Sequence, residues 1–362
     1  MVVTGLLLGA VVLTGAGLAL WSAAAIADIE RRFPPTGRFV EVDGVRIHVV
    51  DRAAAAGFET APPLLFIHGA SGNALDPLTA LGPLVPDGRR ALFVDRPGHG
   101  WSARGAGDDS SLATGPGEPP ADGGTANGDG RVTETGGMAA PAAQARVLGR
   151  LLDRLGIGEA VVVGHSFGGA VAAALAAERR DLVAGLVLVA PVSHPWPGGI
   201  AWYYRLAGTP GLGEIFAWTS AWPMGRLLVD GAIAEAFAPE PVPAGYFART
   251  GTALVLRAPE FLANARDVAS LKANLAAFVP RYPEITAPTV VVTGDRDAVV
   301  YPEIHAEGLA RDIPGARLVR IPGAGHMIHA TRPDAVAAAI AEVTGRSAAA
   351  ASRSAPAVPS GE

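Results

Sequence analysis

Ser166 lies in the segment Gly164-His165-Ser166-Phe167-Gly168-Gly169, which has the spacing of a nucleophilic serine held in a tight turn. The pattern alone is weak, because a chain with 46 glycines gives roughly 0.2 chance matches to it. Its context is more specific: an apolar run at residues 160–163 precedes it and an Ala-rich segment at 169–180 follows, as in a strand-to-helix turn. The N-terminus of a helix also favours developing negative charge. We therefore predict that Ser166 is a nucleophile, against the alternative of an ordinary Gly-rich turn.

A serine hydroxyl needs a base that takes its proton. Asp297 and His326 follow two further apolar runs, at residues 289–292 and 317–321. Polar groups just past the carboxyl ends of parallel strands meet at one edge of a sheet. A carboxylate there would fix the tautomer of the imidazole and stabilise its charged form. We predict His326 as the base and Asp297 as its partner.

Neighbouring residues offer alternatives to both partners. Asp295 lies beside the turn, where such a side chain often accepts hydrogen bonds from backbone amides. His329 comes one helical turn after His326, and His305 lies in a helix-like segment. The remaining histidines with no comparable context are expected to be structural or surface residues: His48, His99 and His194.

An attacked carbonyl also needs N–H donors aimed at its oxygen. The amide of Phe167, directly after the nucleophile, is the first candidate. The second donor should come from the loop after Leu64–Ile67, which reads His68-Gly69-Ala70-Ser71-Gly72-Asn73, and we choose the amide of Ala70. The alternative is that this loop is only a tight turn with a satisfied histidine.

The composition limits other classes of function. The 362 residues are 49% hydrophobic and 17% charged with a net charge of -5, which allows a large core and gives no reason to expect nucleic acid binding. The absence of cysteine excludes disulfides, thiolate nucleophiles and cysteine zinc sites. We expect no metal and no organic cofactor, and the sequence leaves the oligomeric state open.

Short apolar runs that end in turn residues predict the strands of a mainly parallel sheet. They are Arg38–Val42, 45–50, Leu64–Ile67, Ala91–Val94, 160–163, 186–189, 289–292 and Arg317–Ile321. The first two flank Asp43-Gly44, a strong hairpin signal. Helix-like segments at 144–155 and 169–180 alternate with the strands, which indicates a doubly wound α/β fold.

Three segments interrupt this alternation. Residues 193–286 hold four of the six tryptophans at largely helical spacing, so we expect a helical cap between one part of the core at 37–192 and another at 287–346. Residues 105–137 are crowded with Gly, Pro, Asp, Ser and Thr, so we expect a disordered insertion. We expect the Ala/Ser/Pro-rich residues 347–362 to be a disordered tail.

Deletion of residues 105–137 is therefore expected to leave the thermal unfolding midpoint nearly unchanged, because the segment has little apolar surface to bury. Calorimetry of the shortened chain measures this midpoint. A large loss of stability would show that the segment packs on the core.

The N-terminal segment, residues 1–32, carries a targeting signal. Residues 2–27 contain no charged side chain, and an apolar run of about 20 residues can span a bilayer as a helix. We expect a membrane anchor, closed by the polar residues 28–32. The alternatives are export after cleavage of a signal near Ala27, which ends a small-residue Ala-Ile-Ala motif, and a buried or wrongly assigned start.

Five segments in this order resemble the α/β-hydrolase superfamily, in its serine-dependent branch with a cap, over roughly residues 37–344. They are His68-Gly69, residues 95–102 (DRPGHGWS), residues 164–169 (GHSFGG), residues 294–297 (GDRD) and Gly325-His326. The resemblance implies that residues 95–102 form a structural loop beside the active site, and it favours Asp297 and His326 over their neighbours. Relatives that open epoxides or cleave carbon–halogen bonds use Asp at the position of Ser166, which argues against those activities.

The expected function is hydrolysis of a carboxylic ester with small or medium apolar groups, through an acyl-enzyme on Ser166. The same residue set also serves C–C bond hydrolysis, amide or peptide cleavage, acyl transfer and perhydrolysis, and the sequence does not separate these. Two alternatives are not enzymes: a ligand sensor on the hydrolase fold, and a membrane-tethered scaffold with a vestigial hydrolase domain.

Overall fold

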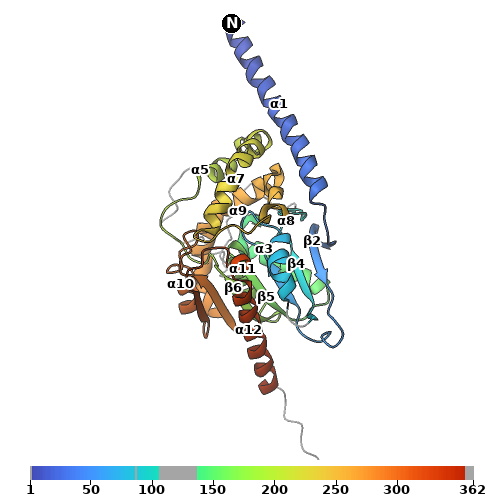
Figure 1. Ribbon diagram of the computed structural model, residues 1–362, viewed down its shortest axis with the longest axis vertical. Coiled ribbons are helices and arrows are strands. Elements are labelled where there is room, and N and C mark those ends of the chain that lie inside the picture. Colours follow the sequence, from blue (N-terminus) through green and yellow to red (C-terminus); the bar gives the residue numbers. More distant parts are fainter. Residues whose placement is uncertain (1, 86–87, 106–136, 355–362) are drawn as a thin grey trace, which may run out of the picture.

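A computed structural model describes residues 2–85, 88–105 and 137–354 of the chain. It shows a central sheet flanked by helices, with one long helix leaving the body at one end (Figure 1). The predicted insertion at 105–137, apart from its two end residues, lies outside the described residues. So does the end of the predicted tail, residues 355–362.

Eight strands form one sheet in the order β1-β2-β4-β3-β5-β6-β7-β8. Their bounds are β1 Arg38–Val42, β2 Val45–Arg52, β3 Leu64–Ile67, β4 Ala91–Val94, β5 Ala160–His165, β6 Val183–Val189, β7 Thr289–Gly294 and β8 Arg317–Ile321. β2 pairs antiparallel with β1 and β4, and all other neighbours are parallel. Four strands have the predicted bounds and four are longer, so the mainly parallel α/β sheet is confirmed.

Helices cover both faces of the sheet, which is why the central strands are apolar on both sides. Along β3, Leu65 and Ile67 face a cluster with α3 (Pro141–Arg154) and α4 (Phe167–Glu178). Leu64 and Phe66 face a second cluster, which contains side chains of α2 (Leu75–Leu81), α11 (Ile328–Thr331) and α12 (Pro333–Ser354). Consecutive residues of a strand point to opposite faces, so each strand contributes to both clusters.

The chain between β6 and β7 is helical, as expected for the segment 193–286. It contains α5 Trp202–Ala207, α6 Leu212–Phe216, η5 Ala217–Ala221, α7 Trp222–Phe237, α8 Tyr246–Arg249, η6 Thr252–Leu256, α9 Ala258–Phe278 and η7 Val279–Glu284. The remaining short elements are η1 Gly82–Leu84, η4 Gly137–Ala139 and α10 Ala306–Asp312. We call residues 193–286 the cap.

The C-terminal helix is longer than expected. The sequence predicted a disordered tail from residue 347, whereas α12 continues to Ser354. Alanine has the highest intrinsic helix propensity, so the Ala-rich stretch extends the helix instead of ending it.

The N-terminal helix α1 (Val2–Arg32) is, among the described residues, the one helix long and apolar enough to cross a membrane, as an anchor or as a signal sequence. Its C-terminal third packs on the body: Ser22 and Ile29 are 1% and 3% exposed. Glu30 also forms an ion pair with Arg257 at 3.2 Å. Figure 1 shows the rest of α1 extending away from the body.

Candidate active site

Ser166 stands at the turn between β5 and α4 in a strained backbone conformation, with φ 52° and ψ -117°. Positive φ is rare for a residue with a side chain. The backbone strain that it causes occurs mainly at functional sites. Glycines make the turn sterically feasible. A Cβ on Gly164 would lie 2.4 Å from the carbonyl oxygen of Gly168, and one on Gly168 would lie 2.3 Å from that of Ile67. The sequence therefore encodes a turn too tight for other residues at these positions.

Asp297 and His326 form a buried pair. His326 Nδ1 lies 2.8 Å from Asp297 Oδ2, and the two residues are 5% and 4% exposed. The other carboxylate oxygen accepts hydrogen bonds from the amides of Val299 and Val300, at 2.9 and 2.8 Å. These bonds fix the carboxylate on the imidazole.

The alternative acid, Asp295, has a different environment. It is exposed, and its carboxylate accepts a hydrogen bond from the amide of Gly323 at 2.7 Å. That bond links the loop after β7 to the loop after β8. Asp295 therefore braces the loop that carries His326 without touching the imidazole.

Ser166 and His326 line one cavity of about 670 Å³ between the carboxyl ends of the strands and the cap. Within the described part of the chain, the Ser166 hydroxyl makes no hydrogen bond, and His326 bonds only to Asp297 through its ring. Their loops do touch: the ring of His165 lies 3.3 Å from the carbonyl oxygen of His326 through Nε2. Catalytic hydrogen bonds are often long without substrate and tighten when substrate binds.

The loop after β3 lies directly against Ser166. A Cβ on Gly69 would lie 3.1 Å from the Cβ of Ser166. Ala70 and Phe167 both line the cavity. The side chain of Arg96 donates to the carbonyl oxygens of His68 and Gly69, each at 3.1 Å. The N–H and C=O of a trans peptide point in opposite directions. The bond from Arg96 to the Gly69 carbonyl oxygen therefore turns the amide of Ala70, which belongs to the same peptide, away from Arg96.

The loop of residues 95–102 supports the loop after β3 through Arg96. Arg96 is fully buried, and its guanidinium lies 4.4 Å from the ring centroid of Phe167. It pairs with Asp267 of α9 at 2.8 Å. Positive neighbours and a hydrogen bond from His99 keep the pKa of Asp267 low despite the opposing effect of burial. The cap is thus tied electrostatically to the loop that carries Ala70.

Two cap residues in this network were not predicted from the sequence, Asn264 and Asp267. Asn264 accepts a hydrogen bond from the amide of Ser71 at 2.7 Å. Both lie on α9, where polar residues occur among apolar ones, and no local pattern marks them as buried. Only their contacts across the chain identify them.

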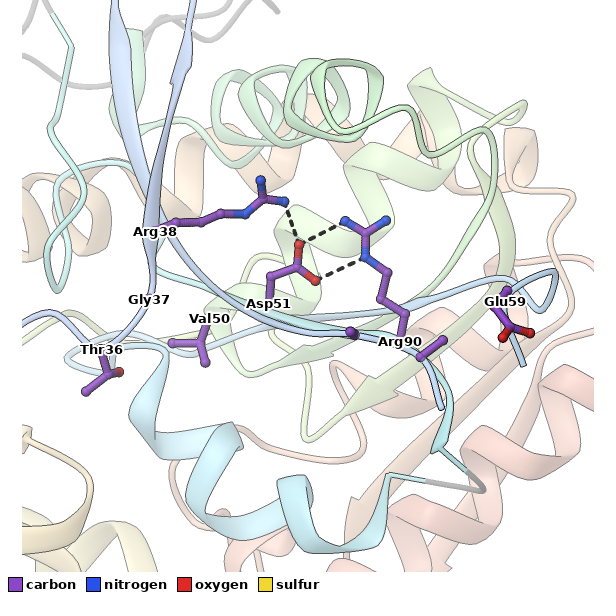
Figure 2. A pocket seen from close by; sticks show the side chains of 9 residues that line it. Thr36, Gly37, Arg38, Val50, Asp51, Glu59 and Arg90 are labelled. Atoms are coloured by element: carbon purple, nitrogen blue, oxygen red, sulfur yellow. Dashed lines mark hydrogen bonds and ion pairs between the residues drawn. The ribbon is translucent and has the colours of Figure 1, made fainter. Parts of the chain in front are cut away.

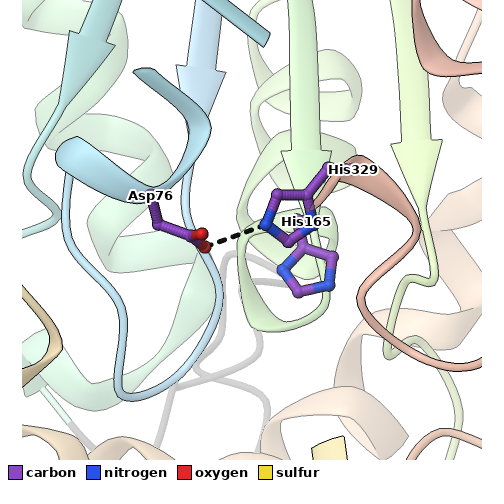
Figure 3. Close-up of side chains that lie close together, drawn as sticks. All are labelled: Asp76, His165 and His329. Carbon is purple, nitrogen blue, oxygen red and sulfur yellow. Dashed lines mark hydrogen bonds and ion pairs between the residues drawn. The ribbon is translucent and has the colours of Figure 1, made fainter. Parts of the chain in front are cut away.

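Asp76, His165 and His329 lie close together, as Figure 3 shows, and His165 directly precedes Ser166. Their ligand-type atoms lie within 4.8 Å of one another, so they could hold a metal ion by spacing. Their hydrogen bonds favour a structural role: the Asp76 carboxylate accepts from His329 Nε2 at 3.0 Å and from the Tyr246 hydroxyl at 2.8 Å. Burial, followed by the neighbouring His329, holds the pKa of His165 well below its usual range, so His165 stays neutral.

The other histidines that were predicted to be structural or surface residues are buried and form hydrogen bonds. His48 Nδ1 lies 2.7 Å from Asp95, His99 Nε2 lies 2.9 Å from Asp267, and His194 Nε2 lies 2.9 Å from Asp312. His305 lines the cavity, but its Nδ1 accepts from the amides of Ser193 and His194 at 3.1 and 3.2 Å. None of the four contacts Ser166 through a hydrogen bond in the described part of the chain.

His305 gives a prediction for stability. Burial, followed by the charge of His194, lowers its pKa to about 4, while an unfolded histidine titrates near 6.5. Below pH 6.5 the unfolded chain binds a proton at His305 that the folded chain does not bind. The stability that the neutral His305 contributes is therefore lost as the pH falls toward 4. His305→Asn keeps an acceptor for the two amides and should reduce the slope by up to about 1.4 kcal/mol per pH unit. Urea unfolding between pH 7 and 4.5 tests this, and equal slopes in variant and wild type would refute it.

A second hollow of about 800 Å³ lies at the other end of the sheet. Figure 2 shows Asp51 between Arg38 and Arg90 in its floor. The carboxylate bonds to Arg38 at 2.6 Å and to Arg90 at 2.9 and 3.0 Å. These charges satisfy one another, and among the described residues no serine or histidine lines the hollow, so it lacks a serine–histidine pair.

Comparisons with known proteins agree with this fold. The family described as the alpha/beta hydrolase fold matches residues 62–333. Haloalkane dehalogenase 2 of Mycobacterium tuberculosis is 26% identical, over 86% of this chain and 95% of that protein. The sn-1-specific diacylglycerol lipase ABHD11 of Mus musculus is 26% identical, over 76% of this chain and 79% of that protein. The solved enol-lactonase from Burkholderia xenovorans LB400 superposes with a TM-score of 0.61 at 20% identity, over 85% of this chain and 100% of that chain. Their names refer to different bonds, so the likeness fixes no single reaction.

Proposed function

Since the chain belongs to the alpha/beta hydrolase fold family, we propose that it is a serine hydrolase that cleaves a carboxylic ester through an acyl-enzyme on Ser166. The observation that carries this proposal is the strained Ser166 turn on the same cavity as a His326 that is already bonded to a buried carboxylate. A nucleophile, a base and a group that orients the base are the parts that acyl transfer needs.

In the proposed reaction, the Ser166 oxygen attacks the ester carbonyl carbon while His326 Nε2 takes the hydroxyl proton. The tetrahedral intermediate collapses, and His326 returns the proton to the departing alcohol. Water then attacks the acyl-enzyme, again giving its proton to His326, and the acid leaves as Ser166 is regenerated. Asp297 accepts from Nδ1 throughout, which keeps Nε2 free to exchange the proton.

The amides of Ala70 and Phe167 are proposed as donors to the oxygen of the intermediate. Both residues line the cavity beside Ser166, and Phe167 is the first residue of α4, where amides lack partners within the helix. The Arg96 bonds to the Gly69 and His68 carbonyls support this role for Ala70, because they fix the peptide that carries its amide. Donors that are fixed before the reaction stabilise the intermediate without a cost of reorganisation.

The substrate is proposed to carry an apolar group. The cap side of the cavity presents large apolar side chains, including Trp196, Phe216, Met224, Val229 and Phe261. Such a lining binds hydrocarbon, while the few polar groups near Ser166 orient the ester. The same triad also suits other acyl bonds. The feature that favours an ester over a long peptide is this apolar lining.

We also propose that α1 is retained as a membrane anchor. Ser22 and Ile26 lie before the cleavage point after Ala27 and Ile29 lies after it, yet all three pack on the body. Cleavage near Ala27 would remove part of this packing, so these contacts favour the anchor over the exported form.

A fluorophosphonate probe tests the proposed function on the full chain in detergent micelles. We expect one covalent adduct, on Ser166, together with turnover of nitrophenyl butyrate. A cavity that binds apolar ligands without labelling or turnover would support the ligand sensor instead. Labelling of Ser166 together with hydrolysis of a C–C or amide substrate, but not of the ester, would support Ser166 as the nucleophile and contradict the ester as substrate.

A further inference from the structure

Six large apolar side chains are exposed on one part of the cap, from α5 to α7. They are Trp202, Leu212, Ile215, Trp218, Leu227 and Leu228, and we call them the cap rim. Leu227 is 83% exposed and Ile215 is 63% exposed. Clustered apolar exposure of this kind marks a surface that contacts something other than water.

The cap rim lies beside the membrane-length helix. Ile26 of α1 packs with Ala217 of η5, the element that contains Trp218 and directly follows α6 with Ile215. In Figure 1, α5 and α7 lie at the end of the body from which α1 extends. The rim and the helix therefore share one end of the molecule.

The length of α1 sets where a bilayer would begin. Among the described side chains of α1, none before Ser22 is buried, and Ser22 is the first to reach the body. A helix of about 20 residues spans roughly 30 Å, the thickness of a hydrocarbon core. Trp21 is 54% exposed at this level, and tryptophan favours the boundary between lipid and water. The bilayer surface then falls at the level of η5.

The cavity reaches the cap rim. Leu228 is 52% exposed and also lines the cavity that contains Ser166. Phe216 and Ala221, on either side of Trp218 in sequence, line the same cavity. The cap rim thus borders the cavity that contains Ser166.

From these observations we propose that the cap rim dips into the bilayer that α1 spans, and that the substrate passes from the bilayer into the cavity. The substrate class would be a lipid ester, whose acyl chain leaves the membrane along an apolar path without crossing water. This inference rests on the proposed function, because it names the substrate of the same site.

The test uses the full chain reconstituted in dioleoylphosphatidylcholine vesicles, with intact mass confirming that α1 is present. Two esters with the same leaving group are compared: nitrophenyl palmitate carried in the vesicles and nitrophenyl butyrate in solution. The double variant Ile215→Glu/Leu227→Glu places two charges on the rim, and neither residue lines the cavity. We expect kcat/KM for the palmitate to fall about tenfold or more, because charged side chains resist insertion into lipid. Butyrate hydrolysis should stay within about twofold, because the reacting groups are untouched.

The control variant Ala56→Glu/Gly158→Glu adds the same two charges at exposed positions before β3 and β5, at the opposite end of the sheet from the cap. A Cβ on Gly158 meets open space, so the change should fold. We expect this control to hydrolyse both esters like the wild type. Equal palmitate rates in the rim variant and the wild type would overturn the proposal, as would a parallel fall with both esters. Failure of the wild type on both esters would instead overturn the hydrolase assignment itself.

Discussion

Ser166→Ala is expected to reduce kcat for nitrophenyl butyrate by about 10⁴-fold or more, because it removes the hydroxyl that is proposed to form the acyl-enzyme. Labelling by the fluorophosphonate probe should disappear with the hydroxyl. Stability should change by no more than about 0.5 kcal/mol, because the hydroxyl makes no hydrogen bond within the described part of the chain and its loss leaves no buried partner unsatisfied.

Ser71→Ala is the matched control for this variant. Its hydroxyl lines the same cavity and accepts a hydrogen bond from Asn264 at 3.0 Å, so its loss perturbs the site without removing the nucleophile. We expect it to retain turnover within about tenfold and to label normally. Steady-state kinetics and peptide mass spectrometry of the adduct measure both variants. Turnover at the wild-type rate in Ser166→Ala would reject the acyl-enzyme.

Asp297→Asn is expected to lower kcat by about 10⁴-fold with little loss of structure. The amide oxygen can still accept from Val299 and Val300, so the loop should keep its shape. The amide nitrogen, however, would donate to Nδ1 of His326 where the carboxylate now accepts. The imidazole would then carry its proton on Nε2 and could not take one from Ser166.

Asp295→Asn provides the comparison, two residues away in the same loop. Asp295 is exposed, and among the described groups it accepts a hydrogen bond only from the Gly323 amide. An Asn oxygen can also accept this bond. We expect less than about a threefold change in kcat. Pre-steady-state acylation rates separate the two variants. If Asp295→Asn were the more damaging substitution, the pairing of His326 with Asp297 would not be the one used in turnover.

The strands and the nucleophile turn could be predicted from the sequence because their signals are local. A central strand buried on both faces must be apolar throughout, so β3 and β4 had the predicted bounds. The turn at Ser166 needs glycine on both sides, since any Cβ at Gly164 or Gly168 would strike backbone. Such steric requirements appear directly in the order of residues.

The end of α12 and the choice between neighbouring residues were less secure. The Ala-rich stretch after residue 346 continues the helix, as the helix propensity of alanine favours, and Ser347 donates a hydrogen bond to the carbonyl oxygen of Ala184 in β6. Asp295 and Asp297 have the same chemistry, and the loop conformation makes one exposed and the other buried. Loop geometry follows from packing that adjacent letters do not specify.

The order of residues alone determined the parallel sheet, the strand-to-helix turn that strains Ser166, and the apolar N-terminal segment, because each follows from sterics or hydrophobicity within a short stretch. Tertiary structure decided which distant groups meet. Asp267 reaches Arg96 across 171 positions, and Ile26 finds Ala217 beside the cap rim. Such contacts depend on how whole helices pack over the sheet, so the burial of a polar side chain or the neighbour of an apolar one is a property of the assembled chain.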